Sequence, residues 1–310
     1  MADIRATPTA SGELDLCGVA LRGRVLNGSG TFDAIAARRV FGDDLLERFP
    51  FDAFVSKTIT LAPRQGNPPP RLWEAPAGLV NSIGLPNKGL EGFLVEDLPR
   101  LAELPVPLVV SVMGFSREVV AAIAARVAER DEVSLVELNF SCPNVETGLI
   151  MGADPAETAW AVERVRAACP KPLIVKLTPN ASDPAAVAVA AEGAGADALA
   201  LVNTLRGTAM DPDGGGGPWL GGGSGGLSGP AVRAVALQQV EAVAAASTLP
   251  VIGMGGIVEP EHALDFLAAG ARWVAVGTES FRDPEAGARI AATLRTAPPL
   301  AAGSAEAALR

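Results

Sequence analysis

The sequence predicts a single (β/α)8 barrel over residues 1–310, and three observations favour it. Eight short apolar runs, rich in β-branched residues, recur along the chain. Segments long enough for a helix separate these runs, and such alternation indicates a parallel sheet covered by helices. A length of 310 residues suits one barrel, which typically needs about 250. An open doubly wound sheet is the alternative, and the count of eight units disfavours it.

The expected strands follow one another from the N-terminus: residues 25–30, 53–59, 107–113, 135–140, 172–178, 198–204, 250–256 and 273–280. Residues 117–130 and 154–169 carry helical patterns between them. Asp154-Pro155 and Asp183-Pro184 each place a capping residue before a proline, which favours the start of a helix. We therefore expect helices to begin at both places.

Two connections are longer than an ordinary strand-to-helix loop. Residues 60–92 follow the second expected strand, and the glycine-rich residues 205–229 follow the sixth. Both leave carboxyl ends of strands, where barrel enzymes keep their active sites, and long loops without secondary structure are usually functional. We expect them to form a lid, with residues 213–226 as its glycine-rich part. A flexible linker between two domains is the alternative for the second segment, but the barrel needs both strands that follow it.

Charge and hydropathy exclude some partners. The net charge is −10, which argues against nucleic acid and anionic membranes. No apolar run approaches the roughly 20 residues of a membrane span. The first residues also lack the basic-then-apolar layout of a signal peptide, so we expect a cytoplasmic protein.

Two lysines break the apolar pattern of the expected strands. Lys57 ends the second strand and Lys176 lies inside the fifth, and they are two of only four lysines in the chain. An ammonium group facing a barrel interior loses hydration worth several kcal/mol unless an anion or a strong acceptor receives it. A structural salt bridge is the alternative for each lysine alone. Two lysines at one barrel face instead favour an anionic ligand.

Amide side chains gather at the same expected face. Asn139 and Asn203 fall at strand ends, and Asn81 and Asn144 lie in loops just beyond strands. Each amide offers a donor and an acceptor, so several together match a planar ring that alternates N–H and C=O groups. A pyrimidine is such a ring. Any one asparagine taken alone is better explained as a turn or cap residue, so the prediction rests on the four occurring together.

Glycine pairs end the seventh and eighth strands, in the segments GMGG (253–256) and VGTES (276–280). Barrels commonly bind phosphate through backbone N–H groups of these two loops. The position of the glycines, more than the motif itself, therefore predicts a phosphate site.

Cys142 is the candidate general base. It lies in the segment NFSCPN, just beyond the fourth strand, where a thiol in a rigid polar loop could take a proton. The only histidine, His262, falls inside a helical segment and is interpreted as structural. Cys17 and Cys169 are interpreted as simply buried.

These segments together resemble the class 1 dihydroorotate dehydrogenases. ELNFSCPN (137–144) is similar to the signature of that family, and SKTIT, NSIGLPN, VKLTPN, IGMGGI and VGTESF occur in the family's order. VNTLRGTAMD and GGLSG look most like the class 1B catalytic subunit. The resemblance extends from about Val25 to Pro284.

The resemblance implies an enzyme of pyrimidine (UMP) biosynthesis that oxidises dihydroorotate to orotate. Cys142 would take a proton from C5 while hydride passes from C6 to FMN. The implied substrate-binding residues are Lys57, Asn81, Ser82, Ile83, Gly84, Leu85, Asn139, Asn144, Asn203 and Thr204. The implied FMN-binding residues are Ser29, Gly30, Lys57, Thr58, Ser111, Asn139, Lys176, Val202, Gly229, Gly255, Gly256, Gly277 and Thr278. Ser111 departs from the family pattern, in which asparagine is common, and no metal site is implied.

The class 1B resemblance also implies a partner. An electron-transfer subunit with FAD and a 2Fe–2S cluster would pass electrons to NAD⁺, and a homodimer of this chain would join it in a heterotetramer. Three cysteines are too few for a four-thiolate cluster in this chain alone. The alternatives are a class 1A homodimer that uses fumarate, a related dihydropyrimidine dehydrogenase, and a non-catalytic barrel that binds flavin.

Overall fold

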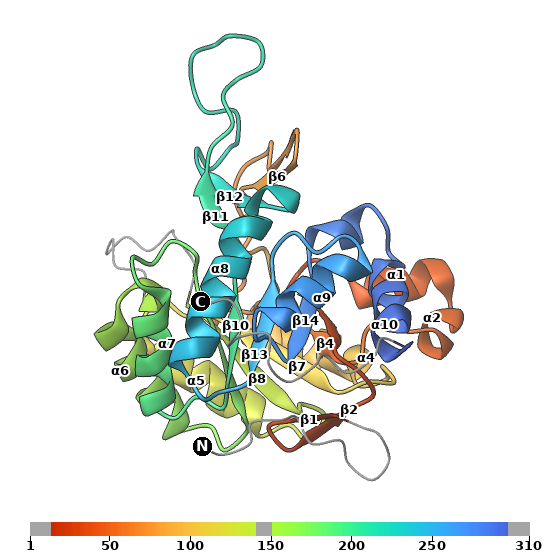
Figure 1. The fold of residues 1–310 in the computed structure, drawn as a ribbon, viewed down its shortest axis with the longest axis vertical. Coiled ribbons are helices and arrows are strands. Elements are labelled where there is room, and N and C mark those ends of the chain that lie inside the picture. The colour runs from red at the N-terminus through yellow and green to blue at the C-terminus, as the bar shows by residue number, and fades with distance from the viewer. Residues whose placement is uncertain (1–13, 141–150, 297–310) are drawn as a thin grey trace, which may run out of the picture.

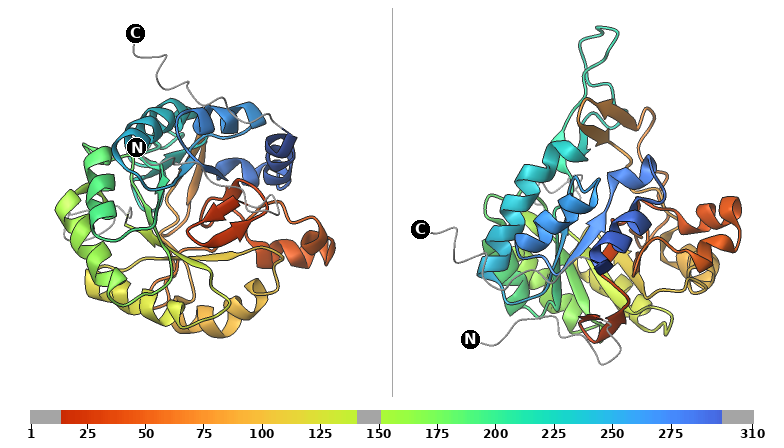
Figure 2. Two further views of the ribbon diagram at one scale, coloured as in Figure 1. Left: turned by 60° about the horizontal axis from the view of Figure 1, so that its bottom comes forward. Right: turned by 45° about the vertical axis from the view of Figure 1, so that its right-hand side comes forward.

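The computed structural model describes residues 14–140 and 151–296, and a closed parallel barrel is its centre. Eight parallel strands form it, in the order β3-β14-β13-β10-β9-β8-β7-β4 (Figure 2). A parallel bridge between Leu26 and Ala53 joins the two outermost strands of that order and closes the ring. The strands are β3 (Val25–Asn27), β4 (Phe54–Val55), β7 (Leu108–Val112), β8 (Leu135–Asn139), β9 (Leu173–Lys176), β10 (Ala198–Leu201), β13 (Val251–Met254) and β14 (Trp273–Val276). The predicted barrel and its eight expected strands are confirmed.

Helices surround the barrel (Figure 2). They are α1 (Ala34–Phe41), α2 (Asp44–Glu47), α3 (Gly89–Gly92), α4 (Leu98–Leu101), α5 (Arg117–Ala128), α6 (Pro155–Arg166), α7 (Pro184–Gly193), α8 (Arg233–Ala246), α9 (Pro260–Ala268) and α10 (Ala286–Thr296). The other helical segments are the π-helix η1 (Phe93–Asp97) and the 3-10 turns η2 (Met151–Ala153), η3 (Pro230–Val232) and η4 (Thr278–Phe281). Asp154 and Asp183 cap α6 and α7 through their side chains, as predicted. No helix in the described ranges is long and apolar enough to cross a membrane.

The barrel interior changes from apolar to polar along its axis. A buried apolar cluster fills its amino-terminal part, with inward residues such as Leu135, Ile174 and Trp273. A hairpin of β1 (Leu14–Leu16) and β2 (Val19–Leu21), which the sequence analysis did not predict, adds two fully buried leucines to this cluster (Figure 1). The apolar filling and the hairpin leave the carboxyl ends of the strands as the place for a ligand.

The two long connections contain short strands, which the sequence analysis did not predict. They pair with each other in an antiparallel sheet, β11-β12-β6-β5, which projects from the barrel (Figure 1). Its strands are β5 (Leu72–Ala75), β6 (Gly78–Asn81), β11 (Leu205–Gly207) and β12 (Gly225–Ser228). A Cβ atom at Gly225 would lie 2.2 Å from the carbonyl oxygen of Asn81, so glycine permits the close pairing of β12 with β6. The glycine-rich segment therefore builds a lid sheet and is not a linker.

Candidate active site

A cavity of about 370 Å³ lies at the carboxyl ends of the barrel strands and reaches the lid sheet. All but three of the residues predicted for the site line it. They are Ser29, Gly30, Lys57, Thr58, Asn81, Ser82, Ile83, Gly84, Leu85, Asn139, Lys176, Val202, Asn203, Thr204, Gly229, Gly255, Gly256, Gly277 and Thr278. The fold thus brings residues from both long connections and seven strand ends into one space.

The other three predicted residues have different positions. Cys142 and Asn144 belong to residues 141–150, which lie outside the described part of the chain. Ser111 is fully buried in β7 and does not line the cavity. Its neighbour in register on β8 is Glu137, two residues deeper in the barrel than Asn139. Ser111 therefore lies among the residues that support the cavity wall.

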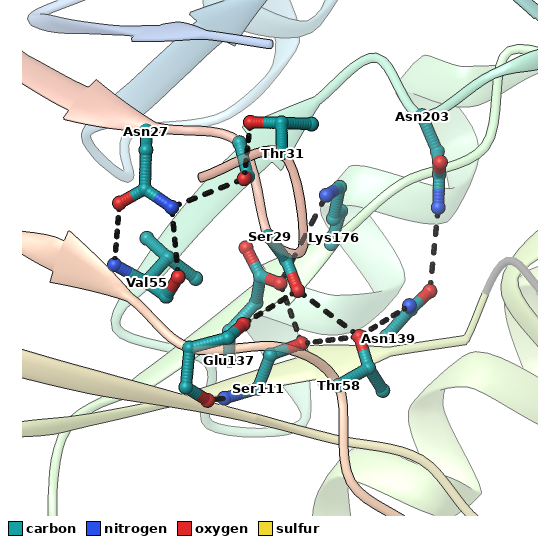
Figure 3. A network of polar contacts seen from close by, with 12 residues as sticks. Asn27, Ser29, Thr31, Val55, Thr58, Ser111, Glu137, Asn139, Lys176 and Asn203 are labelled. Carbon is teal, nitrogen blue, oxygen red and sulfur yellow. Dashed lines mark hydrogen bonds and ion pairs between the residues drawn. The ribbon is translucent and has the colours of Figure 1, made fainter. Parts of the chain in front are cut away.

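A chain of polar side chains crosses the barrel beneath the cavity (Figure 3). The Ser111 hydroxyl donates to Glu137 Oε1 at 2.8 Å and contacts the Thr58 hydroxyl at 2.9 Å. Thr58 Oγ1 accepts from the Asn139 amide at 3.1 Å, and Asn203 donates to Asn139 Oδ1 at 3.3 Å. Hydrogen bonds thereby link side chains at β4, β7, β8 and β10 in the absence of a ligand.

The supply of hydroxyl protons limits the possible directions of the hydrogen bonds in this chain. The Ser29 hydroxyl donates to the carbonyl oxygen of Ser56 at 2.8 Å, and the single Ser111 hydroxyl proton goes to Glu137. Each hydroxyl has one proton to donate. The Thr58 proton can therefore go either to Ser29, at 3.1 Å, or to Ser111, at 2.9 Å. Thr58 in turn sets the orientation of the Asn139 amide at the cavity wall.

Lys176 is buried and has a carboxylate nearby. Its side chain is 6% exposed, and its Nζ lies 3.9 Å from Oε1 of Glu137, which is 3% exposed. The separation is that of an ion pair and is too long for a hydrogen bond. Such a pair attracts by about 4 kcal/mol at an effective dielectric constant near 20, while burial costs several kcal/mol for each ion. The pair thus offsets part of the cost of placing a cation on the cavity wall.

Lys57 is the second cation on the wall. Burial, together with the positive charge of Lys176, lowers the pKa of Lys57. Within the described ranges, no carboxylate forms an ion pair with it. Its side chain lies against Gly30, where a Cβ atom would be 2.8 Å from Lys57 Cδ. The cavity therefore holds a positive charge that an anionic ligand could balance.

The loops after β13 and β14 fit a phosphate such as that of FMN. Gly256 has a φ of +73°, and a Cβ atom there would lie 2.8 Å from the carbonyl oxygen of Gly229. For the backbone amides of Gly255, Gly256 and Thr278, the described residues provide no hydrogen-bond acceptor. The Thr278 hydroxyl donates to Ser228 at 2.8 Å and so ties this loop to the lid sheet. Free amides around a space without side chains form a typical phosphate cradle.

Two polar residues were missed by the sequence analysis. Glu137 lies in the ELNFSCPN motif, and the only signal was an acidic residue at an inward position of an otherwise apolar strand. Asn27 ends β3, and its amide bonds both the N–H and the C=O of Val55, at 2.8 Å each, so it helps to close the barrel.

In the described part of the chain, neither His262 nor a metal site adds a catalytic group to the cavity. The Nδ1 atom of His262 accepts from the N–H of Glu259 at 3.1 Å and caps α9, which agrees with its structural interpretation. Among the described residues, no group of three or more His, Cys, Asp or Glu side chains could hold a metal ion.

We predict that Lys57→Met stabilises the ligand-free protein at pH 7. A lowered pKa means that the folded state disfavours the charged lysine, so removing the charge should raise the free energy of unfolding by about 0.5–2 kcal/mol. The loss of stability caused by the charged lysine is largest at pH values below the lowered pKa, and it disappears as pH rises above that value. The stabilisation by Lys57→Met should therefore be smaller in alkaline buffer. Urea unfolding from pH 7 to pH 10 measures this, with Lys171→Met as the control. Equal effects of the two variants would contradict the prediction.

Comparison with known proteins gives one consistent result. The family profile for dihydroorotate dehydrogenase matches residues 13–297. The protein named dihydroorotate dehydrogenase B (NAD(+)), catalytic subunit, from Desulforudis audaxviator is 45% identical over 283 residues, which are 90% of each chain. Proteins of the same name from Pelobacter propionicus and Geobacter sulfurreducens are 45% and 42% identical, over 90% and 91% of both chains.

Proposed function

The chain belongs to the dihydroorotate dehydrogenase family, and on that premise we propose that it oxidises dihydroorotate to orotate in pyrimidine biosynthesis. The observation that carries the proposal is the composition of the cavity at the carboxyl ends of the barrel strands. It combines a phosphate cradle, two lysines and amide side chains in about 370 Å³. These groups match a nucleotide cofactor and a planar anion.

FMN fits the inner part of this cavity. Its phosphate would be held by the loops that contain Gly255, Gly256, Gly277 and Thr278, and its ring would lie against Lys176. FMN, when bound, supplies a hydride acceptor at its N5 atom. The Lys176 ammonium, held in place beneath the cavity, favours negative charge on a ring beside it.

The substrate would be bound between the barrel and the lid sheet. Lys57 offers a positive charge for its carboxylate, while Asn139 and Asn203 present amide groups to its ring. Asn81 ends β6, and its amide donates to the carbonyl oxygen of Gly226 at 3.2 Å. This hydrogen bond joins residues 60–92 to residues 205–229 at the cavity wall. The lid sheet could therefore both position the substrate and exclude water.

Cys142 is our proposed base, because the other two cysteines are poorly placed for that role. Burial, followed by the charge of Asp197, raises the pKa of Cys17 to about 12, and Cys17 lies at the turn of the amino-terminal hairpin. Cys169 is 1% exposed, and burial raises its pKa as well. Cys142 follows β8 by three residues, and Asn139 at the end of β8 lines the cavity.

We predict that Cys142→Ala slows flavin reduction by dihydroorotate about 10²–10⁴-fold, the usual contribution of a general base. Bound FMN should remain, and Cys142→Ser should be intermediate because a hydroxyl is a poorer base than a thiolate. Stopped-flow absorbance measures the rate, with Cys169→Ala as a matched control that keeps the wild-type rate. Reduction of the Cys142→Ala variant at the wild-type rate would place the base elsewhere.

For the exit of electrons we propose a class 1B arrangement. A partner subunit with FAD and a 2Fe–2S cluster would carry electrons to NAD⁺, in a heterotetramer with a homodimer of this chain. The rim of the cavity supports a docking site: Phe281 and Leu72 line it yet are 60% and 52% exposed. Beside them Arg282 pairs with Glu74 at 2.7 Å. An apolar centre with a charged rim is typical of protein interfaces.

We predict that the chain alone reduces its FMN with dihydroorotate but turns over NAD⁺ negligibly. NAD⁺ turnover should appear on addition of the FAD and iron–sulfur subunit, and Phe281→Ser should weaken that gain without changing flavin reduction. Steady-state assays with NAD⁺ and with fumarate measure both activities. Rapid fumarate turnover by the isolated chain would instead favour class 1A.

A further inference from the structure

Glu137 has no part in the chemistry proposed above, yet it is one of the most buried charged groups of the described chain. We propose that Glu137 is a positioning residue that keeps the Lys176 ammonium protonated and in place on the cavity wall. The inference rests on the proposed FMN function, because its effect is read through the flavin.

The geometry places Glu137 where it can act on Lys176. Its carboxylate is 3% exposed and lies 3.9 Å from Lys176 Nζ. The same oxygen accepts a hydrogen bond from the Ser111 hydroxyl at 2.8 Å. Ser111, on the neighbouring strand β7, therefore orients the Glu137 carboxylate (Figure 3). Glu137 does not itself line the cavity, whereas Lys176 does. Any influence of Glu137 on a ligand in contact with the wall should therefore pass largely through Lys176.

The charges around Lys176 make such a partner necessary. Lys57, beyond β4, repels Lys176, and this repulsion contributes to the lowered pKa of Lys57. The side chains that β7 and β10 contribute nearby, Ser111 and Asn203, are neutral. The other fully buried carboxylate of the described residues, Asp52, pairs with Arg295 of α10 at 2.7 Å. Glu137 is thus a buried negative group beside Lys176, and without it the Lys176 ammonium should lose its proton more readily.

The test is the midpoint potential of bound FMN between pH 6 and pH 9, in the holoenzyme. A cation beside the flavin stabilises its reduced form, so Lys176→Met should lower the potential throughout. In Glu137→Gln, which keeps the side-chain volume, the potential should match that of the wild type at pH 6. It should then fall to the Lys176→Met value by pH 9. Glu163→Gln, an exposed carboxylate on α6, should follow the wild type at every pH.

A second comparison separates Glu137 acting through Lys176 from Glu137 acting on the flavin directly. In the Lys176→Met background, adding Glu137→Gln should leave the pH profile unchanged. A profile of Glu137→Gln parallel to that of the wild type, or a shift that persists without Lys176, would overturn the proposal.

Glu137→Asp covers the case in which Glu137→Gln does not fold. Its carboxylate is retained but withdrawn from Lys176, so the fall in potential should be smaller and begin at higher pH. A wild-type profile in this variant, when the Gln variant is not obtained, would contradict the proposal. A wild-type chain that binds no FMN would instead contradict the proposed function, which is a different failure.

Discussion

Burying two ammonium groups at one end of a closed barrel is the constraint on which the rest of this site depends. Lys57 and Lys176 both line the cavity, and burial lowers the pKa of Lys57. The chain carries a net charge of −10, so an anion approaching it meets a repulsive field everywhere except at such local cations. The arrangement therefore costs stability in the ligand-free protein, and the two ammonium groups would favour an anionic ligand.

The remainder of the barrel makes this arrangement possible. Apolar side chains and the β1–β2 hairpin fill the amino-terminal part, which leaves one polar end where hydrogen bonds replace apolar packing. There Ser111, Thr58 and Asn139 are joined by hydrogen bonds, and the Ser111 hydroxyl donates to Glu137. These hydrogen bonds orient the Asn139 and Asn203 amides before a ligand binds. The lid sheet closes the same end, so binding and exclusion of water are served by one set of contacts.

Much of this could be predicted from the sequence, and the exceptions have physical causes. The eight strands were evident because a strand buried on both faces reads as a continuous apolar run. Strand β12 was not evident, because glycine has no side chain and so shows no alternation of apolar and polar residues. Gly225 instead allows the backbone to approach Asn81 closely. Polar residues at strand ends predicted Lys57, Lys176, Asn139 and Asn203, which line the cavity, whereas most other predicted site residues came from the family resemblance. Ser111 and Glu137 sit one inward step deeper, at paired positions of β7 and β8, and depth along a strand depends on register, which one sequence does not reveal.

The central claim is that this polar end of the barrel is a preformed FMN site. The most direct measurement is the amount of flavin released when the purified chain is denatured, determined by absorbance and chromatography against an FMN standard. The account predicts a yellow protein that releases about one FMN per chain, since a single cradle follows β13 and β14. A colourless chain that takes up no added FMN while remaining folded would contradict it.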